Sequence, residues 1–132
     1  MGAYAFRLRI ILFVSSCIVD IIKRLPYPNN FIEYTHRPEE ACDCNLLSNQ
    51  GPVPRNPGFP SGHVAMAAYF SYIMVFKYFD NTYYNLGLAT LFPIIIGMSR
   101  YYKRCHNIYQ IIAGWILGTC VAYLIKQHLY KE

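Results

Sequence analysis

Apolar residues in this chain gather into four long runs, joined by polar connections of very unequal length. The runs cover residues 6–22, 64–79, 83–98 and 108–125. Each is about 17 residues long, the shortest length at which a helix crosses the hydrocarbon core of a bilayer. The pattern predicts an all-α fold with four helices in a single domain over residues 1–132.

Two of these runs favour a membrane bundle over a soluble one. Residues 86–98 and 111–125 carry no charge on any face, whereas the helices of a small soluble bundle need polar outer faces. Charged residues make up only 14% of the chain, against roughly a quarter in ordinary globular proteins. We expect a multi-pass integral membrane protein, a membrane-embedded helical bundle with about four transmembrane helices. Four buried helices of a soluble bundle are the alternative.

The connection between the first two runs is the only long polar segment. Residues 23–62 hold every proline except Pro93, so we expect a structured loop. Loops of this length in compact domains usually carry function. If all four runs cross a bilayer, this loop and the short connection 99–107 lie on the same side of it, where they can meet.

Each of these two connections carries a histidine beside groups that bind phosphate. The loop ends in Pro60-Ser61-Gly62-His63, a turn with free backbone N–H groups before the second run. The short connection contains Ser99-Arg100 and, after five more residues, His106. The net charge of +5 comes from scattered Lys and Arg rather than a basic arm, so we expect anionic head groups and no nucleic acid as partners. Together these features indicate phosphoryl transfer from a lipid.

Arg37-Pro38, then Pro60-Ser61-Gly62-His63, then Ser99-Arg100 with His106 resemble the three-part signature of the type 2 phosphatidic acid phosphatase (PAP2) superfamily. The resemblance implies a helical bundle that hydrolyses phosphate esters through a phosphohistidine, with no metal or other cofactor. It predicts a phosphatase of lipid phosphates or polyprenyl diphosphates. Because membrane members of the family have six helices, the four predicted here lack the first two, and a homodimer would complete the bundle.

The resemblance also implies roles for individual residues. His106 matches the nucleophile, whose ring nitrogen attacks phosphorus. His63 matches the general acid that protonates the leaving group. The residues expected to bind phosphate oxygens through side chains or backbone N–H groups are Lys23, Arg37, Ser61, Gly62 and Arg100.

The first departure from the family pattern concerns a lysine. The family places it seven residues before Arg37, where this chain has Asn30. Lys23 lies fourteen residues before Arg37. Either the loop contains an insertion and Lys23 still reaches the phosphate, which we favour, or Arg24 or Arg55 replaces it.

The second departure is Gln110, which stands where the family has an aspartate four residues after the nucleophile. Positions 106 and 110 share one helix face, so the Gln110 carbonyl can accept the ring proton of His106 and fix its tautomer. It cannot supply the charge that raises the basicity of the ring. We therefore expect Gln110→Asp to raise the rate. A catalytically impaired homologue that binds phospholipid head groups is the alternative function.

Three cysteines lie in the two polar connections. A disulfide from Cys105 to Cys42 or Cys44 is expected if that side of the membrane is oxidising. Zinc is not expected, because Cys-X-Cys lacks the usual ligand spacing and His106 is better explained as the nucleophile. Arg7 and Arg9, at the start of the first run, favour a cytosolic N-terminus and a lumenal or external active site.

Overall fold

The structure, a computed structural model, describes residues 2–45 and 49–129. These residues form four long helices, α1 (Gly2–Lys23), α3 (Gly62–Tyr78), α4 (Tyr83–Tyr102) and α5 (Ile108–Leu129). The loop between α1 and α3 contains a short 3-10 helix, η1 (Asn29–Phe31), and one turn of helix, α2 (Ile32–Thr35). No strand is present in the described part of the chain. The predicted all-α class is confirmed.

The four apolar runs coincide with the four long helices, but α1, α4 and α5 continue past the last residue of their runs. The helix α4 extends to Tyr102, one turn past the predicted end at Met98, and Lys103 caps it. This extension places Arg100 in the last turn of α4. At the other end of the same helix, the Thr82 side chain accepts a hydrogen bond from the backbone N–H of Asn85 at 3.2 Å, as expected for a threonine N-cap.

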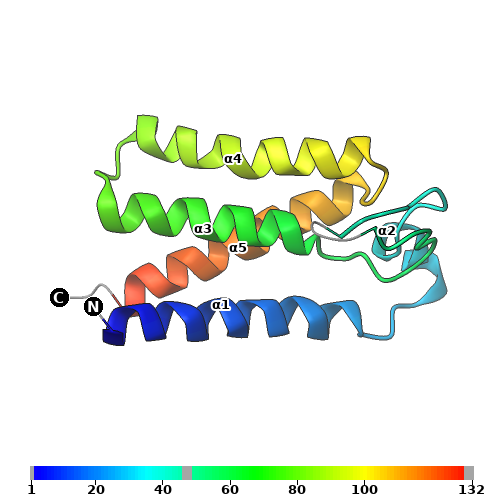
Figure 1. The fold of residues 1–132 in the computed structure, drawn as a ribbon, viewed down its shortest axis with the longest axis horizontal. Helices are drawn as coiled ribbons and strands as arrows, with labels where there is room; N and C mark the ends of the chain where they lie inside the picture. Colours follow the sequence, from blue (N-terminus) through cyan, green and yellow to red (C-terminus); the bar gives the residue numbers. More distant parts are fainter. Residues whose placement is uncertain (1, 46–48, 130–132) are drawn as a thin grey trace.

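Helix α3 lies at the centre of the bundle and packs against α4, α5 and α1 (Figure 1). Two glycines of α5 allow its close approach to α3. A Cβ atom on Gly114 would stand 2.4 Å from the Ser61 carbonyl oxygen, and one on Gly118 would stand 2.1 Å from the Ala65 carbonyl oxygen. Any side chain at these positions would push α5 away from the start of α3.

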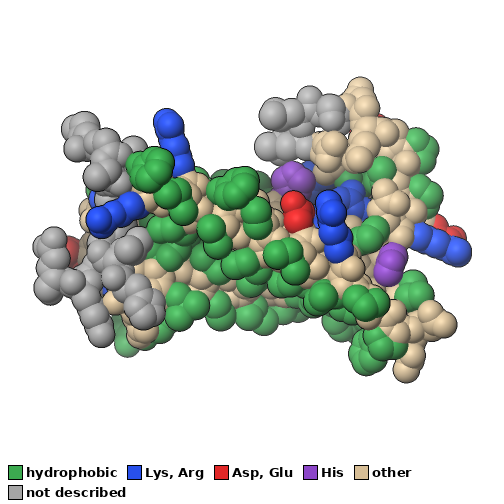
Figure 2. All heavy atoms as spheres, turned by 90° about the horizontal axis from the view of Figure 1, so that it is seen from below, with side chains coloured by type: hydrophobic (Ala, Val, Ile, Leu, Met, Phe, Trp, Pro, Cys, Tyr) green, Lys and Arg blue, Asp and Glu red, His purple; other side chains and the backbone are tan. Residues whose placement is uncertain are grey.

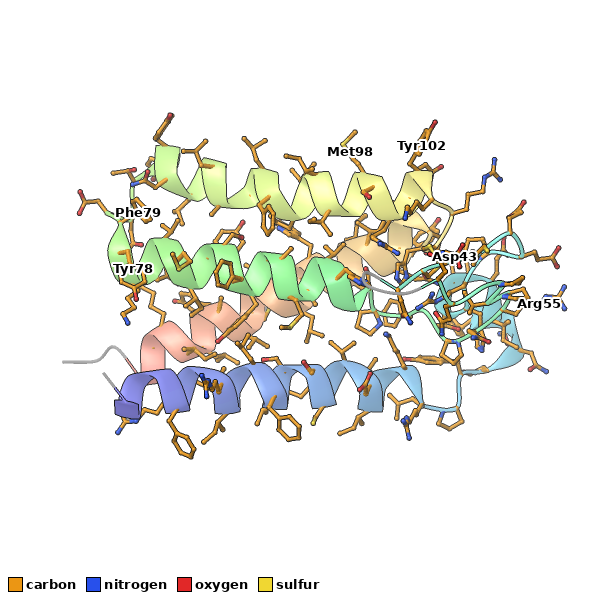
Figure 3. All side chains as sticks on the ribbon, in the orientation of Figure 1. Asp43, Arg55, Tyr78, Phe79, Met98 and Tyr102 are labelled. Atoms are coloured by element: carbon orange, nitrogen blue, oxygen red, sulfur yellow. A yellow bond between two sulfur atoms is a disulfide. The ribbon has the colours of Figure 1, made fainter. Side chains whose placement is uncertain are left out.

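The loop and the α4–α5 connection meet at one end of the bundle, as the alternation of the helices predicts (Figure 1). The α3–α4 connection lies at the opposite end, which is also the end at which α1 begins. Figure 3 shows the same separation, with Asp43 and Arg55 in the loop at one end and Tyr78 and Phe79 at the other. The two histidine segments are therefore neighbours in space.

Membrane crossing is supported for one helix by length and composition. Among the helices described, α5 alone is long and apolar enough to cross a membrane, and its candidate span is Ile108–Gln127. The prediction of four transmembrane helices is not confirmed. Helix α3 has only 17 residues, and α1 carries arginines near its start and Asp20 and Lys23 near its end.

Large apolar side chains nevertheless cover the outside of the bundle. Phe13 on α1 is 71% exposed and Met98 on α4 is 67% exposed. Met98 and Tyr102 point away from α3 (Figure 3). On the face shown in Figure 2, apolar side chains extend along the bundle between its two ends, where charged side chains gather. An apolar surface of this extent marks a contact with a membrane or another protein.

Candidate active site

A cavity of about 650 Å³ opens between α1, α3 and α4 at the loop end of the bundle. Polar residues and a glycine line the part next to the loop: Asp20, Lys23, Arg37, Asn45, Gly62, His63, Ser99, Arg100 and His106. Mostly apolar side chains line the part that continues between the helices: Leu12, Ser16, Val19, Met66, Ala67, Phe70, Phe92 and Ile96. We call the first part the cationic end and the second the apolar groove.

Both predicted histidines and all the predicted phosphate ligands except Ser61 line this cavity. Ser61 is fully buried and precedes the first residue of α3 as its N-cap. Its backbone N–H donates to the Gln110 carbonyl oxygen at 2.9 Å. Ser61 therefore fastens the end of the loop to α5. Gly62 and His63 follow in the first turn of α3, where unpaired backbone N–H groups and the helix dipole favour an anion.

Arg100 reaches the cavity from the last turn of α4. It is only 4% exposed, and its Nη2 donates to the Cys44 carbonyl oxygen at 2.6 Å. Cys44 also forms a disulfide with Cys105, with the two Cα atoms 5.5 Å apart. The structure thus selects Cys44 over Cys42, whose thiol is free and exposed. The disulfide fastens the loop to the residue just before His106.

Arg37 is carried by the loop, which is held in place by backbone contacts. Its N–H donates to the Asn56 carbonyl oxygen at 2.9 Å, next to an isolated bridge between His36 and Pro57. The N–H of Gly58 donates to the Thr35 carbonyl oxygen at 2.9 Å. Two distant parts of the loop therefore run side by side where Arg37 enters the cavity.

Lys23, and neither arginine considered as its replacement, lines the cavity. It is the last residue of α1, and its Nζ lies 3.8 Å from where a Cβ atom on Gly62 would stand. Arg55 instead forms an ion pair with Glu39 in the loop, and both side chains are exposed. The structure therefore places the Lys23 ammonium group beside the first turn of α3, as the favoured interpretation of the sequence requires.

Several donors around the cationic end are buried without a partner among the described residues. They are Nε and Nη1 of Arg37 and Nε of Arg100, and Ser61 Oγ is buried in the same way. An unsatisfied buried donor costs about 1–3 kcal/mol, and more when it is charged. Two guanidinium groups with free N–H groups facing one cavity are suited to the oxygens of a phosphate.

His106 is held by Gln110, one turn later on α5. His106 Nδ1 lies 2.9 Å from Gln110 Oε1. His106 is 2% exposed and Gln110 is completely buried. Because an amide oxygen only accepts hydrogen bonds, Nδ1 carries the ring proton. Nε2 then keeps its lone pair, which is the form that a nucleophile needs.

The electrostatics of the cavity disfavour further positive charge. Burial and the positive charge of Arg37 lower the pKa of Lys23, and burial lowers the pKa of Arg37, with a further contribution from Arg100. Burial and the neighbouring cations, Arg100 first, lower the pKa of His63 to about 4. Burial lowers the pKa of His106 to about 3, against the Gln110 hydrogen bond, which raises it. Both histidines are therefore neutral at pH 7 in the protein alone, and a bound anion would relieve the repulsion.

Sequence reasoning missed three residues at or near this site. Asp20 and Asn45 line the cavity, and a Cβ atom on Gly58 would stand 2.8 Å from Gln110 Oε1. Asp20 lies three residues before Lys23 on α1, a spacing that puts both on one helix face and could have identified it. Nothing in the sequence around Gly58 distinguishes it from an ordinary turn glycine.

Comparisons with curated proteins and with solved structures return no match. A family model described as the PAP2 superfamily matches residues 3–132. This match covers nearly the whole chain, including the loop, both histidines and both cavity arginines. The chain therefore belongs to the PAP2 superfamily.

Proposed function

We propose that this protein hydrolyses lipid phosphate or polyprenyl diphosphate esters through a phosphohistidine at His106. Membership of the PAP2 superfamily supports phosphoester hydrolysis in general. The observation that carries the finer proposal is the two-part cavity, in which unpaired guanidinium donors adjoin an apolar groove. One part suits a phosphate and the other suits a hydrocarbon chain, so one lipid phosphate molecule would fill both.

The first step would transfer the phosphoryl group to the enzyme. His106 Nε2 attacks phosphorus, the bond from phosphorus to the leaving oxygen breaks, and His63 donates its proton to that oxygen. Arg37 and Arg100 hold the remaining phosphate oxygens, and Lys23 adds a third positive charge. These fixed charges stabilise the negative charge that spreads over the phosphoryl group in the transition state.

The second step would release inorganic phosphate. A water molecule attacks the phosphohistidine from the side that the leaving group has vacated, and neutral His63 accepts its proton. The bond between phosphorus and Nε2 breaks, which returns His106 with its lone pair and His63 in the protonated form. The Gln110 hydrogen bond keeps Nδ1 protonated throughout the cycle.

We also propose that all four long helices lie in a membrane. Exposed apolar side chains along α1, α3 and α4 support this placement, as does the apolar composition of α5. The Cys44–Cys105 disulfide supports a lumenal or external active site. A homodimer remains the proposed way of completing the bundle.

The decisive experiment measures phosphate release by detergent-solubilised protein. Hexadecyl phosphate, farnesyl diphosphate and p-nitrophenyl phosphate serve as substrates. His106→Ala should reduce turnover by about a thousandfold or more, and labelled phosphate should be trapped on the wild type only. Gln127→Ala is the control, because Gln127 is exposed near the end of α5 and lies outside the cavity lining. Full turnover by His106→Ala would overturn the proposal.

The apolar groove is tested separately. Ile96→Trp adds bulk to the groove without changing a charged residue. We expect it to raise KM for hexadecyl phosphate and leave p-nitrophenyl phosphate hydrolysis nearly unchanged, since the shorter substrate needs only the cationic end. Equal effects on both substrates would argue against a lipid in the groove.

A second candidate function is binding of phospholipid head groups without turnover. The specific observation behind it is Gln110, which brings no negative charge to the nucleophile. This candidate predicts that phosphate binds the cationic end while no substrate is hydrolysed.

A further inference from the structure

We propose that Gln110 is a positioning residue whose side chain must be an amide, because it joins the nucleophile to the loop that carries Arg37. The proposal rests on the role of His106 described above. It reverses the expectation that an aspartate at position 110 would improve the enzyme. It also identifies Gly58 as part of the same junction.

Both ends of the Gln110 amide are occupied. Oε1 accepts from His106 Nδ1 at 2.9 Å. At the other end, Nε2 donates to the His36 carbonyl oxygen at 2.7 Å and to the Tyr34 carbonyl oxygen at 3.2 Å. The Gln110 backbone is held as well, because its N–H donates to Asn107 Oδ1 at 3.0 Å. No part of this side chain is exposed.

The two backbone carbonyls determine the orientation of the amide. A carbonyl oxygen can only accept, so the NH₂ group of Gln110 must face Tyr34 and His36. The amide oxygen must then face His106, and the proton of that hydrogen bond must come from Nδ1. A single arrangement of hydrogen bonds satisfies every group, and it leaves His106 Nε2 unprotonated.

A carboxylate cannot make this arrangement. Glutamate has the length of glutamine, and its second oxygen would stand against two carbonyl oxygens with no proton between them. Aspartate is one methylene shorter, so it would either lose contact with the loop or draw α5 toward it. Glutamate would therefore set a buried acceptor against acceptors, and an aspartate out of reach of the loop would leave the Tyr34 and His36 carbonyl oxygens without their donor; both are costly. The charge that aspartate provides to the histidine in relatives therefore has no suitable place in this loop conformation.

Gly58 makes the junction possible. A Cβ atom at this position would stand 2.8 Å from Gln110 Oε1 and 2.9 Å from Arg37 Cγ. One added methyl group would therefore press on the residue that orients the nucleophile and on a phosphate ligand at once. His36, whose carbonyl oxygen Gln110 binds, is the residue before Arg37, so a displaced Gln110 disturbs both sides of the phosphate site.

The first test uses wild-type protein labelled with ¹⁵N-histidine, in detergent at pH 7. The ¹⁵N shifts of His106 should show a neutral ring with the proton on Nδ1. Assignment comes from comparison with His106→Gln. A ring protonated on Nε2, or a mixture of tautomers, would overturn the proposal. This readout requires no activity, so it stands even if the protein proves not to be a phosphatase.

The second test compares Gln110→Glu and Gln110→Asp with Gln127→Glu, which makes the same charge change at an exposed position of α5. We expect kcat for phosphate release to fall by about tenfold to a hundredfold in both position-110 variants, because His106 loses its connection to the loop that carries Arg37. Gln127→Glu should resemble the wild type. A position-110 carboxylate variant as fast as the wild type would overturn the proposal. An inactive wild type with the Nδ1–H tautomer would instead overturn the proposed function and leave the positioning role intact.

Discussion

Inorganic phosphate should raise the pKa of His63 substantially when it occupies the cavity. In the empty cavity this pKa is about 4, because burial and the neighbouring cations disfavour the imidazolium. A general acid with this pKa is protonated in about one molecule in a thousand at pH 7. The proposed reaction therefore requires the negative charge of the substrate to raise the pKa of His63, so that more of it is protonated.

The magnitude follows from Coulomb's law. At an effective dielectric constant of about 20, one negative charge about 5 Å from the ring stabilises the imidazolium by about 3 kcal/mol. That corresponds to a pKa rise of about 2, which brings His63 from about 4 to about 6. The protonated fraction at pH 7 then increases to about one in ten. Because His63 loses its proton as the pH rises, kcat should fall about tenfold for each pH unit above the raised pKa of His63.

The assay is an NMR titration of ¹⁵N-labelled His63 with and without saturating phosphate, assigned with His63→Gln. Potassium chloride at matched ionic strength is the control, because it screens the cations without occupying the site. The pH profile of kcat supplies a second reading. A pKa that stays near 4 in the presence of phosphate would refute the reasoning, as would a value near 6.5 in the empty protein.

Three further predictions concern packing, the disulfide and the general acid. Gly118→Ala should lower the free energy of unfolding by about 1–3 kcal/mol, since its Cβ would stand 2.1 Å from a backbone oxygen of α3. Gly87→Ala is the control, because a Cβ there meets nothing within 4 Å. In thermal melts the control should be neutral or stabilising. Non-reducing peptide mapping should link Cys44 to Cys105. Removing this bond should cost about 4 kcal/mol for a separation of 61 residues, and finding both thiols free would contradict the predicted pairing. His63→Ala should slow hexadecyl phosphate hydrolysis much more than p-nitrophenyl phosphate hydrolysis, because the latter leaving group needs little protonation; equal losses would remove His63 from this role.

The helices were predictable from sequence because long, mostly apolar runs leave few alternatives to a helix. The meeting of His63, His106, Arg37 and Arg100 at one cavity was predictable because their spacing along the chain matches a known motif. The place of Lys23 in the cavity was harder to predict, since it depends on α1 continuing one residue beyond the apolar run. The choice between Cys42 and Cys44 depends on which side of an irregular segment faces the bundle, and no periodicity encodes that.

The loop itself could not be predicted. Its path is set by backbone contacts, such as the bridge between His36 and Pro57 and the hydrogen bond from Ser61 to the Gln110 carbonyl. Every residue has a backbone carbonyl and every residue except proline has a backbone N–H, so the sequence does not reveal which of these groups pair. For the same reason, the sequence suggested that Gln110 is a weakened aspartate, whereas the structure shows two carbonyl oxygens that accept its amide protons.

The division of the cavity into a cationic end and an apolar groove has a consequence for the order in which products leave. With a lipid monophosphate as substrate, the proposed mechanism leaves the phosphoryl group on His106 while the alcohol product has lost its only charged group. The groove alone then holds the alcohol, and the attacking water needs the space beside phosphorus that its hydroxyl occupies. The alcohol must therefore leave first, and added alcohol should slow release of the second product by competing with water for that space.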